Sequence, residues 1–377
     1  MSTLVAQPFQ IGKRTENLID SERNNRSVPT EIYYPAVSAG NNAPLAQGTF
    51  PLIVFGHGFV MSYSSYENIS DFLVPKGYII AFANTENGLS PSHANFGADL
   101  RFIARQLVEN FNQVQGNFWF EKFNGKKAVM GHSMGGGASM LAASNNNTFD
   151  LVVGLAPAET NPSAVAAAAS ITAPLLIFAG SNDGVTPPVQ HQLPIFNAAT
   201  NSPCRKYISI NGGGHCFFAN SSFTCELGEG TSNPQPTINR QQQQSVLNDF
   251  SITMLETFLK NQSLNWQAFL DSLNTSTRIT AQQVCGLNVL SIENPKAFEA
   301  RLFPQPASMF LHVKTNQSPL AHLTVYDMKG NKRDVPLLDK DDRQSVLNLS
   351  SLSPGMYLLK VESKSGVTYR TRFIVAR

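Results

Sequence analysis

The chain has 377 residues, of which 42% are hydrophobic and 14% are charged, and its formal net charge is +2 at pH 7. The apolar share is enough for a sizeable core, and the low net charge creates no overall field that would attract nucleic acid. Pro, Asn or Gly interrupts every candidate run of about 18 apolar residues, so a membrane-spanning helix is excluded.

The sign of the charge changes near residue 300. Residues 301–377 carry 12 basic and 6 acidic side chains, whereas residues 1–300 hold the remaining 16 basic and 20 acidic ones. The net charges of the two parts are therefore +6 and −4. This break indicates two units of different composition.

The N-terminal residues Met1–Pro8 contain neither the basic region nor the apolar stretch of an export signal. Taken literally, this means that the chain has no such signal. A chain from which a signal has been removed, with Met1 added in its place, would look the same. Both interpretations stay open at this point.

The first 260 residues alternate short apolar runs with helical patterns, which predicts a mostly parallel sheet covered by helices on both faces. Nearly every position of the apolar runs is apolar, as in strands that are buried on both faces. The predicted strands are Leu52–Phe55, Tyr78–Ala83, Lys127–Met130, Leu151–Leu155, Leu175–Ala179 and Tyr207–Ile210. Helices are predicted over Ala98–Asn112 and Gln241–Leu259, and an antiparallel or mixed edge near Thr30–Tyr34.

Short alternating segments without helices follow Phe303, and they predict a small β-sandwich of about 70 residues. Its predicted strands are Met309–Val313, Leu320–Asp327, Val346–Leu349, Met356–Glu362 and Thr368–Val375. We therefore divide the chain into an α/β domain (1–265), a connecting segment (266–303) that begins with a helix at Trp266–Leu273, and an all-β domain (304–377).

The four cysteines, Cys204, Cys216, Cys225 and Cys285, lie within 82 residues and form no C-x-x-C pair, which argues against a zinc knuckle or a thioredoxin-type motif. Four cysteines allow three disulfide pairings. Cys216 and Cys225 are close enough to close one loop, and we favour that bridge; four reduced thiols are the alternative.

One segment carries a chemical signature: Gly131-His132-Ser133-Met134-Gly135-Gly136-Gly137 directly follows a predicted strand and opens an Ala-rich helix. In this context G-x-S-x-G holds a serine in a strained turn above the sheet, and small residues are needed where strand and helix approach. We therefore predict Ser133 as a nucleophile and the N–H of Met134 as an oxyanion donor. The alternative is a Gly-rich turn without chemistry.

A serine hydroxyl needs a base and an orienting acid, which in such folds follow in the order Ser, Asp, His on loops at the carboxyl ends of later strands. Asp183 follows the predicted strand Leu175–Ala179, and His215 follows Tyr207–Ile210. Both stand where the geometry needs them. A plain loop turn and a satisfied loop histidine are the alternatives.

The competing residues fail on position. Asp150 precedes its strand, at the wrong end of the sheet, and Asp249 lies inside a predicted helix. His191 is expected at the start of a surface helix between two strands.

A second oxyanion donor is expected after the early strand Leu52–Phe55, where Gly56-His57-Gly58-Phe59 follows. We predict the N–H of Phe59 as this donor and its ring as a wall of the pocket. His57 is expected to shape the loop rather than to take part in catalysis, and His132 to line the cleft rather than merely pack. Phe217 borders an apolar cleft or packs in the core; the sequence leaves both open.

Residues 28–260 resemble the bacterial polyester hydrolases and cutinases (PETases) within the dienelactone-hydrolase-like α/β-hydrolases. The resemblance is carried by the Ser133 motif, by Leu176-Ile177-Phe178-Ala179 leading to Asn182-Asp183, and by Ile210-Asn211-Gly212-Gly213-Gly214-His215. It implies an α/β-hydrolase fold, a serine carboxylesterase with Phe59 and Met134 as oxyanion donors, and no cofactor or metal.

This chain departs from the best-known polyesterases at one substrate-binding position. They have Ala-Pro-x-x-x-Trp after the next strand, whereas this chain has Ala156-Pro157-Ala158-Glu159-Thr160-Asn161. Asn161 therefore stands where the aromatic clamp for terephthalate units is expected. The cysteines also fall differently, with Cys216 beside His215 and none close before Asp183.

Residues 304–377 resemble the C-terminal sorting domain of the bacterial type IX secretion system. The matching pieces are Phe303-Pro304-Gln305-Pro306, Val325-Tyr326-Asp327-Met328-Lys329-Gly330, Pro354-Gly355-Met356-Tyr357-Leu358 and Thr371-Arg372-Phe373-Ile374-Val375. The resemblance implies secretion to the outside or to the cell surface, which agrees with a removed signal and with disulfides.

The sequence therefore predicts a secreted serine carboxylester hydrolase with Ser133, Asp183 and His215 as its triad. The expected substrates are polyesters such as polyethylene terephthalate and short-chain esters, and the expected partner is the type IX secretion machinery. We expect a monomer that binds no nucleic acid. A lipase or short-chain esterase with incidental polymer activity is the first alternative, and a non-catalytic surface binding protein is the second.

Overall fold

The computed structural model describes residues 8–285, 300–315, 320–328, 330–340, 344–363 and 368–377. The chain divides into two compact units, residues 1–286 and residues 287–377, and each is described by itself. No helix within the described ranges is long and apolar enough to cross a membrane.

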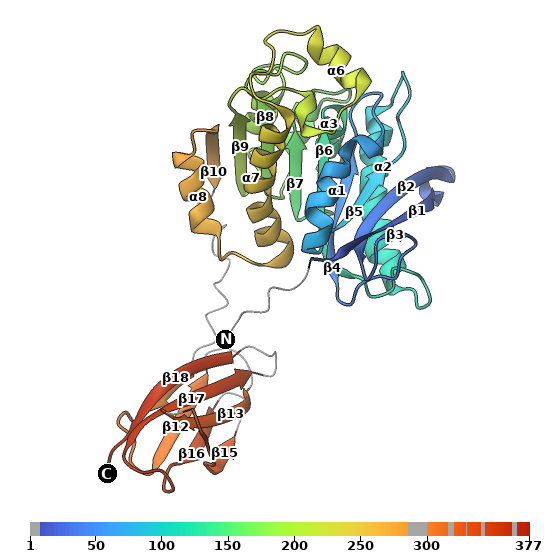
Figure 1. Cartoon of the computed structure of the whole chain (residues 1–377). Coiled ribbons are helices and arrows are strands. Elements are labelled where there is room, and N and C mark those ends of the chain that lie inside the picture. Colours follow the sequence, from blue (N-terminus) through green and yellow to red (C-terminus); the bar gives the residue numbers. More distant parts are fainter. Residues whose placement is uncertain (1–7, 286–299, 316–319, 329, 341–343, 364–367) are drawn as a thin grey trace. The chain divides into compact units, whose positions relative to one another are not determined.

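The centre of the first unit is a ten-stranded sheet in the order β10-β9-β8-β7-β6-β4-β5-β2-β1-β3 (Figure 1). Six neighbouring strands are parallel, and nearly all of their residues are buried, as the apolar runs predicted. They are β4 (Phe50–Gly56), β5 (Ile79–Ala83), β6 (Phe123–His132), β7 (Leu151–Leu155), β8 (Leu175–Gly180) and β9 (Cys204–Ile210). The predicted α/β fold is confirmed.

The outer strands of the sheet are mostly antiparallel. β2 (Arg26–Ala36) pairs with β5 and contains the edge predicted near Thr30–Tyr34. β1 (Gln10–Asp20) pairs with β2 along its whole length, and the two-residue β3 (Gly40–Asn41) lies beside it. Most positions of β1 are exposed or half-buried, so its sequence has no apolar run that would have predicted it.

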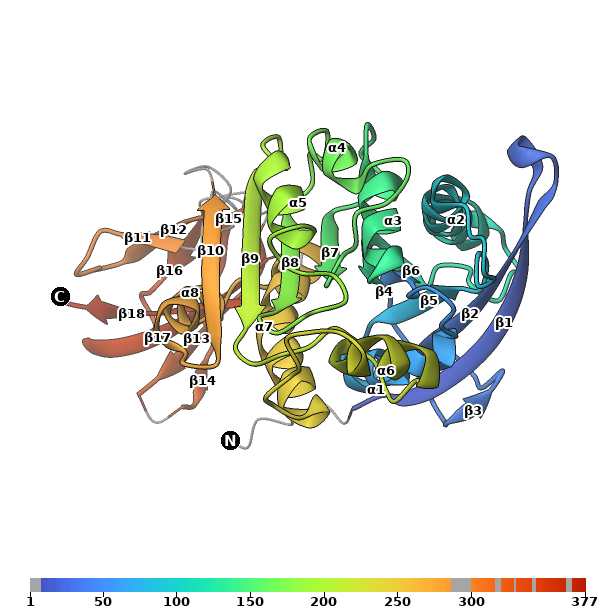
Figure 2. The same cartoon turned by 90° about the horizontal axis from the view of Figure 1, so that it is seen from above.

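Helices cover both faces of the sheet (Figure 2). One face carries α2 (His93–Arg105), α3 (Met134–Ala143), α4 (Ala164–Ala168) and α5 (Gln192–Ala198); the other carries α1 (Glu67–Leu73), α7 (Arg240–Lys260) and α8 (Trp266–Thr275). The predicted helix Gln241–Leu259 is confirmed as α7. The predicted helix Ala98–Asn112 begins earlier, in α2, and continues as a π-helical turn over Gln106–Asn110.

Shorter elements connect these layers. α6 (Phe223–Gly230) lies at the top of the unit in the view of Figure 1. Single turns of 3-10 helix occupy Ser21–Arg23, Tyr63–Tyr66, Val74–Lys76, Phe111–Gln113 and Cys216–Phe218.

The predicted connecting segment 266–303 divides differently in the structure. α8 and the strand β10 (Ile279–Cys285) belong to the first unit, because β10 pairs with β9 from Ile279 opposite Ile210 to Cys285 opposite Cys204. A disulfide joins Cys204 to Cys285. β10 is an edge strand whose side chains are mostly exposed, so its polar sequence concealed it. At the other end, β11 (Ala300–Phe303) belongs to the second unit.

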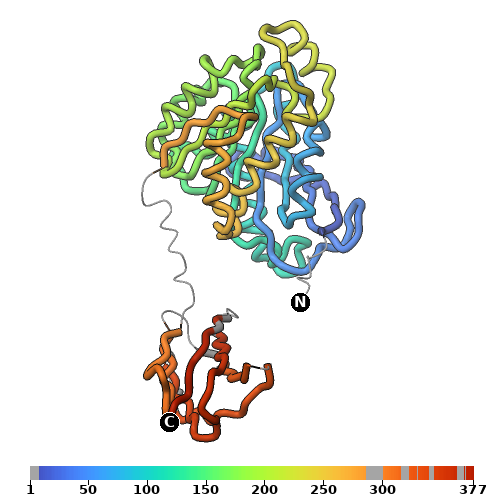
Figure 3. Tube along the Cα trace, turned by 60° about the vertical axis from the view of Figure 1, so that its left-hand side comes forward, coloured from blue at the N-terminus to red at the C-terminus, as the bar shows by residue number. Residues whose placement is uncertain are grey.

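In the second unit, whose trace runs from orange to red in Figure 3, the described residues form two four-stranded antiparallel sheets. One has the order β11-β12-β16-β15 and the other β14-β13-β17-β18. Their bounds are β12 (Phe310–Thr315), β13 (Leu320–Asp327), β14 (Lys332–Arg333), β15 (Leu337–Lys340), β16 (Gln344–Asn348), β17 (Gly355–Ser363) and β18 (Thr368–Val375). The small all-β domain is confirmed; β11, β14 and β15 are too short for the alternation to have predicted them.

Candidate active site

Two adjacent strands of the sheet, β4 and β6, lead into loops that carry candidate residues. After β4 the chain continues to β5 on one side, whereas after β6 it continues to β7 on the other side. Loops that diverge at such a switch point leave a crevice at the carboxyl ends of the strands. The loop after β4 contains His57 and Phe59, and β6 ends directly before Ser133.

Ser133 has a positive φ of 54°, with ψ −121°. A residue with a side chain rarely adopts this conformation unless its surroundings enforce it. Three hydrogen bonds do so: the N–H of Ser133 donates to the carbonyl of Leu155 at 3.0 Å, and its carbonyl accepts from Gly137 at 3.0 Å and from Ala158 at 2.9 Å. The turn is the strained strand-to-helix turn that the motif predicted.

Two glycines of the motif have a steric reason. A Cβ atom at Gly131 would collide with the backbone of Gly135, and one at Gly135 would collide with the backbone of Gly56. β6, α3 and the end of β4 can therefore approach one another only because these positions lack side chains.

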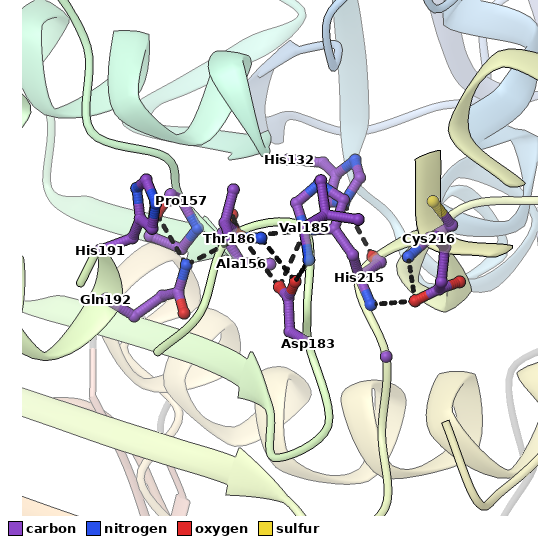
Figure 4. Close-up of polar contacts among 12 residues, drawn as sticks. His132, Ala156, Pro157, Asp183, Val185, Thr186, His191, Gln192, His215 and Cys216 are labelled. Atoms are coloured by element: carbon purple, nitrogen blue, oxygen red, sulfur yellow. Dashed lines mark hydrogen bonds and ion pairs between the residues drawn. The ribbon is translucent and has the colours of Figure 1, made fainter. Parts of the chain in front are cut away.

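Asp183 and His215 meet in a buried pair (Figure 4). His215 Nδ1 lies 2.8 Å from Asp183 Oδ2, and both side chains are almost fully inaccessible to solvent. Asp183 Oδ1 accepts the N–H groups of Val185 at 2.9 Å and Thr186 at 2.7 Å. The carboxylate is thus fixed by the loop that follows β8, and it holds the imidazole with Nδ1–H as donor.

Thr186 and Gln192 extend this pair, and the sequence did not point to either. The hydroxyl of Thr186 lies 2.8 Å from Asp183 Oδ2 and 2.9 Å from His215 Nδ1, and Gln192 Nε2 donates to it at 3.1 Å (Figure 4). The hydroxyl can therefore donate to the carboxylate while it accepts from Gln192. The one sequence feature that could have pointed to Thr186 is its position three residues after the candidate acid Asp183.

Ser133 and His215 are not hydrogen-bonded to each other in the part of the chain that the structure describes. Ser133 is half-buried, at the end of β6, and His215 follows β9 at the same edge of the sheet.

The predicted oxyanion donors have suitable surroundings. The N–H groups of Phe59 and Met134 donate to no protein acceptor among the described residues. Met134 is the first residue of α3, so its N–H also lies at the positive end of the helix dipole. The ring of Phe59 is half exposed, as a pocket wall would be.

The loop of His215 is held from two helices that the sequence had not connected with it. Glu229 of α6, itself buried, accepts the N–H groups of His215 and Cys216 through Oε1. Gln243 of α7 exchanges two hydrogen bonds of 2.9 Å with the backbone of Gly214. Burial raises the pKa of Glu229 above its ordinary value.

A disulfide between Cys216 and Cys225 ties α6 to the same loop. The bridge that we favoured from the sequence is therefore present, together with the bridge between Cys204 and Cys285. No sequence pattern could have predicted Glu229, because it reaches His215 only through the packing of α6.

His132 corrects one prediction. It does not line the cleft, because its ring is fully buried and both ring nitrogens are engaged. Nδ1 lies 2.8 Å from the hydroxyl of Tyr66, and Nε2 lies 3.0 Å from the carbonyl oxygen of His215. Burial lowers the pKa of His132 well below its ordinary value, so the ring is neutral. It has no nitrogen left for a substrate.

The other predicted binding residues lie in different surroundings. Asn161 is exposed, and its N–H donates to His93 Nδ1 at 3.1 Å. Phe217 is half-buried beneath the guanidinium of Arg240, 4.8 Å from the ring centroid. His57 is buried, with ring nitrogens 2.9 Å from the Gly58 carbonyl and 2.8 Å from that of Thr85, as expected of a loop-shaping residue.

The described residues contain no group of three or more His, Cys, Asp or Glu side chains that could hold a metal ion.

Comparisons with known proteins identify both units. Residues 301–376 match the secretion system C-terminal sorting domain. The resemblance inferred from the sequence is confirmed there, and this domain directs the protein through type IX secretion to the cell surface or beyond it.

The first unit is similar to several curated hydrolases. A bis(hydroxyethyl) terephthalate hydrolase of Streptomyces coelicolor is 26% identical over 193 residues, which are 51% of this chain and 56% of that protein. Cutinase est1 of Thermobifida alba is 24% identical over 225 residues (56% of this chain, 70% of the cutinase). Cutinase 1 of Thermobifida cellulosilytica is 22% identical over 217 residues (56% and 80%).

Residues 20–229, more than half of the chain, match the family described as PET hydrolase-like. This range includes the turn at Ser133, the buried pair of Asp183 and His215, and Glu229. The chain therefore belongs to the PET hydrolase-like family, and with it to the carboxylic ester hydrolases.

Proposed function

We propose that the protein is a secreted serine carboxylester hydrolase that cleaves polyesters such as polyethylene terephthalate and also short-chain esters. The buried contact of 2.8 Å between Asp183 and His215, at the same sheet edge as the strained Ser133, is the observation that carries the proposal. A serine, a base and an acid in this order and at these strand ends suit acyl transfer.

In the proposed reaction Ser133 Oγ attacks the ester carbonyl while His215 Nε2 takes its proton. Asp183 holds the imidazole through Nδ1–H and stabilises the positive charge that forms on it. The N–H groups of Phe59 and Met134 donate to the oxyanion. The alcohol leaves with the proton from His215, and water, deprotonated by the same residue, releases the acid from Ser133.

Large apolar side chains exposed on the loops after the parallel strands support an extended, apolar substrate. All of them follow the carboxyl ends of strands, as the three candidate catalytic residues do. They are Phe59 after β4, Leu89 after β5, Val185 and Val189 after β8, and Phe223 and Leu227 on α6 after β9. Such a rim suits contact with the surface of a solid polyester.

One observation favours the alternative of a short-chain esterase with only incidental polymer activity. Asn161 occupies the position at which polyesterases carry a tryptophan, and it is exposed. The similarity to a bis(hydroxyethyl) terephthalate hydrolase also supports a small soluble ester as substrate.

The test compares the protein with its Ser133→Ala variant on amorphous polyethylene terephthalate film and on nitrophenyl butyrate. We expect kcat to fall by about 10⁴-fold or more on the soluble ester, with release of terephthalate products lost in parallel. Ser263→Ala, in the turn between α7 and α8, serves as the matched control with unchanged turnover. Retention of a tenth of the turnover in Ser133→Ala would remove Ser133 from the mechanism.

The two assays also separate the alternatives. Serine-dependent release from film supports the polyesterase, whereas fast nitrophenyl butyrate hydrolysis without release from film leaves a short-chain esterase. Failure of a fluorophosphonate to label Ser133 would favour a non-catalytic binding protein. We further propose that the protein is a monomer without a nucleic-acid partner, which size-exclusion chromatography and a DNA-binding assay check.

A further inference from the structure

A chain of buried hydrogen bonds joins the loop after β4 to the loop after β9. The N–H of Gly58 donates to the hydroxyl of Tyr66 at 2.8 Å. The same hydroxyl lies 2.8 Å from His132 Nδ1, and His132 Nε2 lies 3.0 Å from the carbonyl oxygen of His215. Tyr66 and His132 are both fully buried.

The groups at the two ends of this series of hydrogen bonds decide which atom donates and which accepts in each bond. A carbonyl oxygen only accepts, so His132 Nε2 carries the hydrogen; in a neutral imidazole Nδ1 is then the acceptor. The hydroxyl of Tyr66 therefore donates to Nδ1, and its oxygen remains free to accept from Gly58. Met61 Sδ, 3.1 Å from the hydroxyl, is a competing but weaker acceptor.

The two ends of this series of hydrogen bonds lie in the loops that carry the proposed oxyanion donor and the proposed base. Gly58 directly precedes Phe59, the proposed oxyanion donor, and His215 is the proposed base. These residues come from loops that follow different strands, and their relative position has to be kept within about 0.5 Å for the reaction to be efficient. A contact that runs between them through buried side chains can fix that position.

We propose that Tyr66 and His132 are positioning residues. They keep the loop of Gly58 and Phe59 at a fixed distance from the loop of His215. The inference rests on the proposed function, since it needs His215 as base and Phe59 as donor. Both side chains act through the backbone of Gly58 and His215, and neither contacts the substrate. The role is different from the cleft-lining role that the sequence suggested for His132.

Tyr66→Phe removes the hydroxyl and keeps the ring in place. We expect kcat for nitrophenyl butyrate to fall by about tenfold and KM to stay within about twofold, because the substrate contacts remain while the oxyanion donor and the base shift. Labelling by a fluorophosphonate should slow by a similar factor, since it uses the same donor and base.

Tyr78→Phe is the matched control. Tyr78 is also fully buried, and its hydroxyl has no hydrogen-bond partner among the described residues. Its removal deletes the same atom from a core without breaking a hydrogen bond, so kcat should stay within about twofold of that of the unchanged protein.

Conservative replacement of His132 supplies a rescue. The side-chain amide introduced by His132→Gln can present an N–H to the His215 carbonyl and an oxygen to Tyr66, whereas leucine can do neither. We expect His132→Gln to keep a kcat at least severalfold above that of His132→Leu. Adding Tyr66→Phe to His132→Leu should change kcat little further, because the chain is already broken.

A kcat of Tyr66→Phe within about twofold of the unchanged protein would overturn the inference, as would a loss confined to KM. Equal losses in Tyr66→Phe and Tyr78→Phe would also overturn it, since a general packing defect would then explain both. If His132→Leu fails to fold, the comparison of the two tyrosine variants decides alone. Ser133→Ala in the same assay tests the proposed function separately.

Discussion

Two loops at the same edge of the sheet differ in how they are held. The loop after β9 places His215 in the interior, and its backbone is bonded to the buried side chains of Glu229, Gln243 and His132. The loop after β7 reaches the surface at Asn161. There, two backbone N–H groups, of Glu159 and Asn161, donate to His191 and His93.

In the proposed function, the first loop carries the base and the second takes part in substrate recognition. A base must stay within a fraction of an ångström of its working position, so its loop gains from several buried hydrogen bonds. A substrate-binding loop can be exposed and can change its side chains at little cost in stability. The first loop should therefore respond strongly to the loss of a single polar group, and the second should tolerate substitution.

The largest effect is expected at the acid of the buried pair. Asp183→Asn keeps the shape of the side chain but removes the charge that holds the His215 tautomer, so kcat for nitrophenyl butyrate should fall by about 10⁴-fold. Asp249→Asn makes the same chemical change at an exposed position of α7 and should leave kcat nearly unchanged. Retention of a tenth of kcat in Asp183→Asn would contradict the role of Asp183.

A smaller effect is expected at Glu229. Glu229→Leu leaves two buried N–H groups without an acceptor, which should lower the free energy of unfolding by about 1–3 kcal/mol and reduce kcat. Glu229→Gln keeps an acceptor oxygen and should retain most of the activity. Thermal unfolding together with steady-state kinetics measures both; a Glu229→Leu variant as stable and active as the unchanged protein would show that α6 does not support His215.

The pH dependence of Glu229→Gln sharpens this prediction. Because burial raises the pKa of Glu229 above its ordinary value of 4.5, its contribution to stability is complete below that value and is lost as the pH rises through the raised pKa. Glutamine has no such loss. The Tm of Glu229→Gln relative to the unchanged protein should therefore increase from about pH 4 to about pH 8, and a difference independent of pH would contradict it.

The smallest effect is expected in the exposed loop. Asn161→Trp restores an aromatic ring at the clamp position, and an aromatic pair contributes about 0.5–1.5 kcal/mol, or roughly 2- to 12-fold in product release from film. The kcat/KM for nitrophenyl butyrate should stay within about twofold. Asn161→Leu controls for added apolar surface without a ring; an equal gain with leucine would reject stacking.

The contact between two of the candidate catalytic residues could be predicted from the sequence, because parallel strands gather their following loops at one edge of the sheet. Asp183 and His215 were found from strand ends alone, and their contact was then observed. Tyr66, Glu229 and Gln243 could not be found in this way. They reach the site from helical segments through tertiary packing, which leaves no pattern in the local sequence.

The direction of a side chain was equally inaccessible. His132 is adjacent to Ser133 in the sequence, yet it is turned into the core toward Tyr66 rather than toward solvent. Near the two ends of the sheet, β1 and β10 could not be predicted because a strand with mostly polar, exposed side chains has no apolar run.

The disulfide between Cys204 and Cys285 has a mechanical consequence. Along the polypeptide, residues 287–377 follow the end of β10 at Cys285, so a pull on the chain from that side reaches β10 first. Without a covalent link, such a pull would separate an edge strand from its neighbour one hydrogen bond at a time. The bridge from Cys285 to Cys204 passes the tension directly to β9, so the outermost strand stays attached under load.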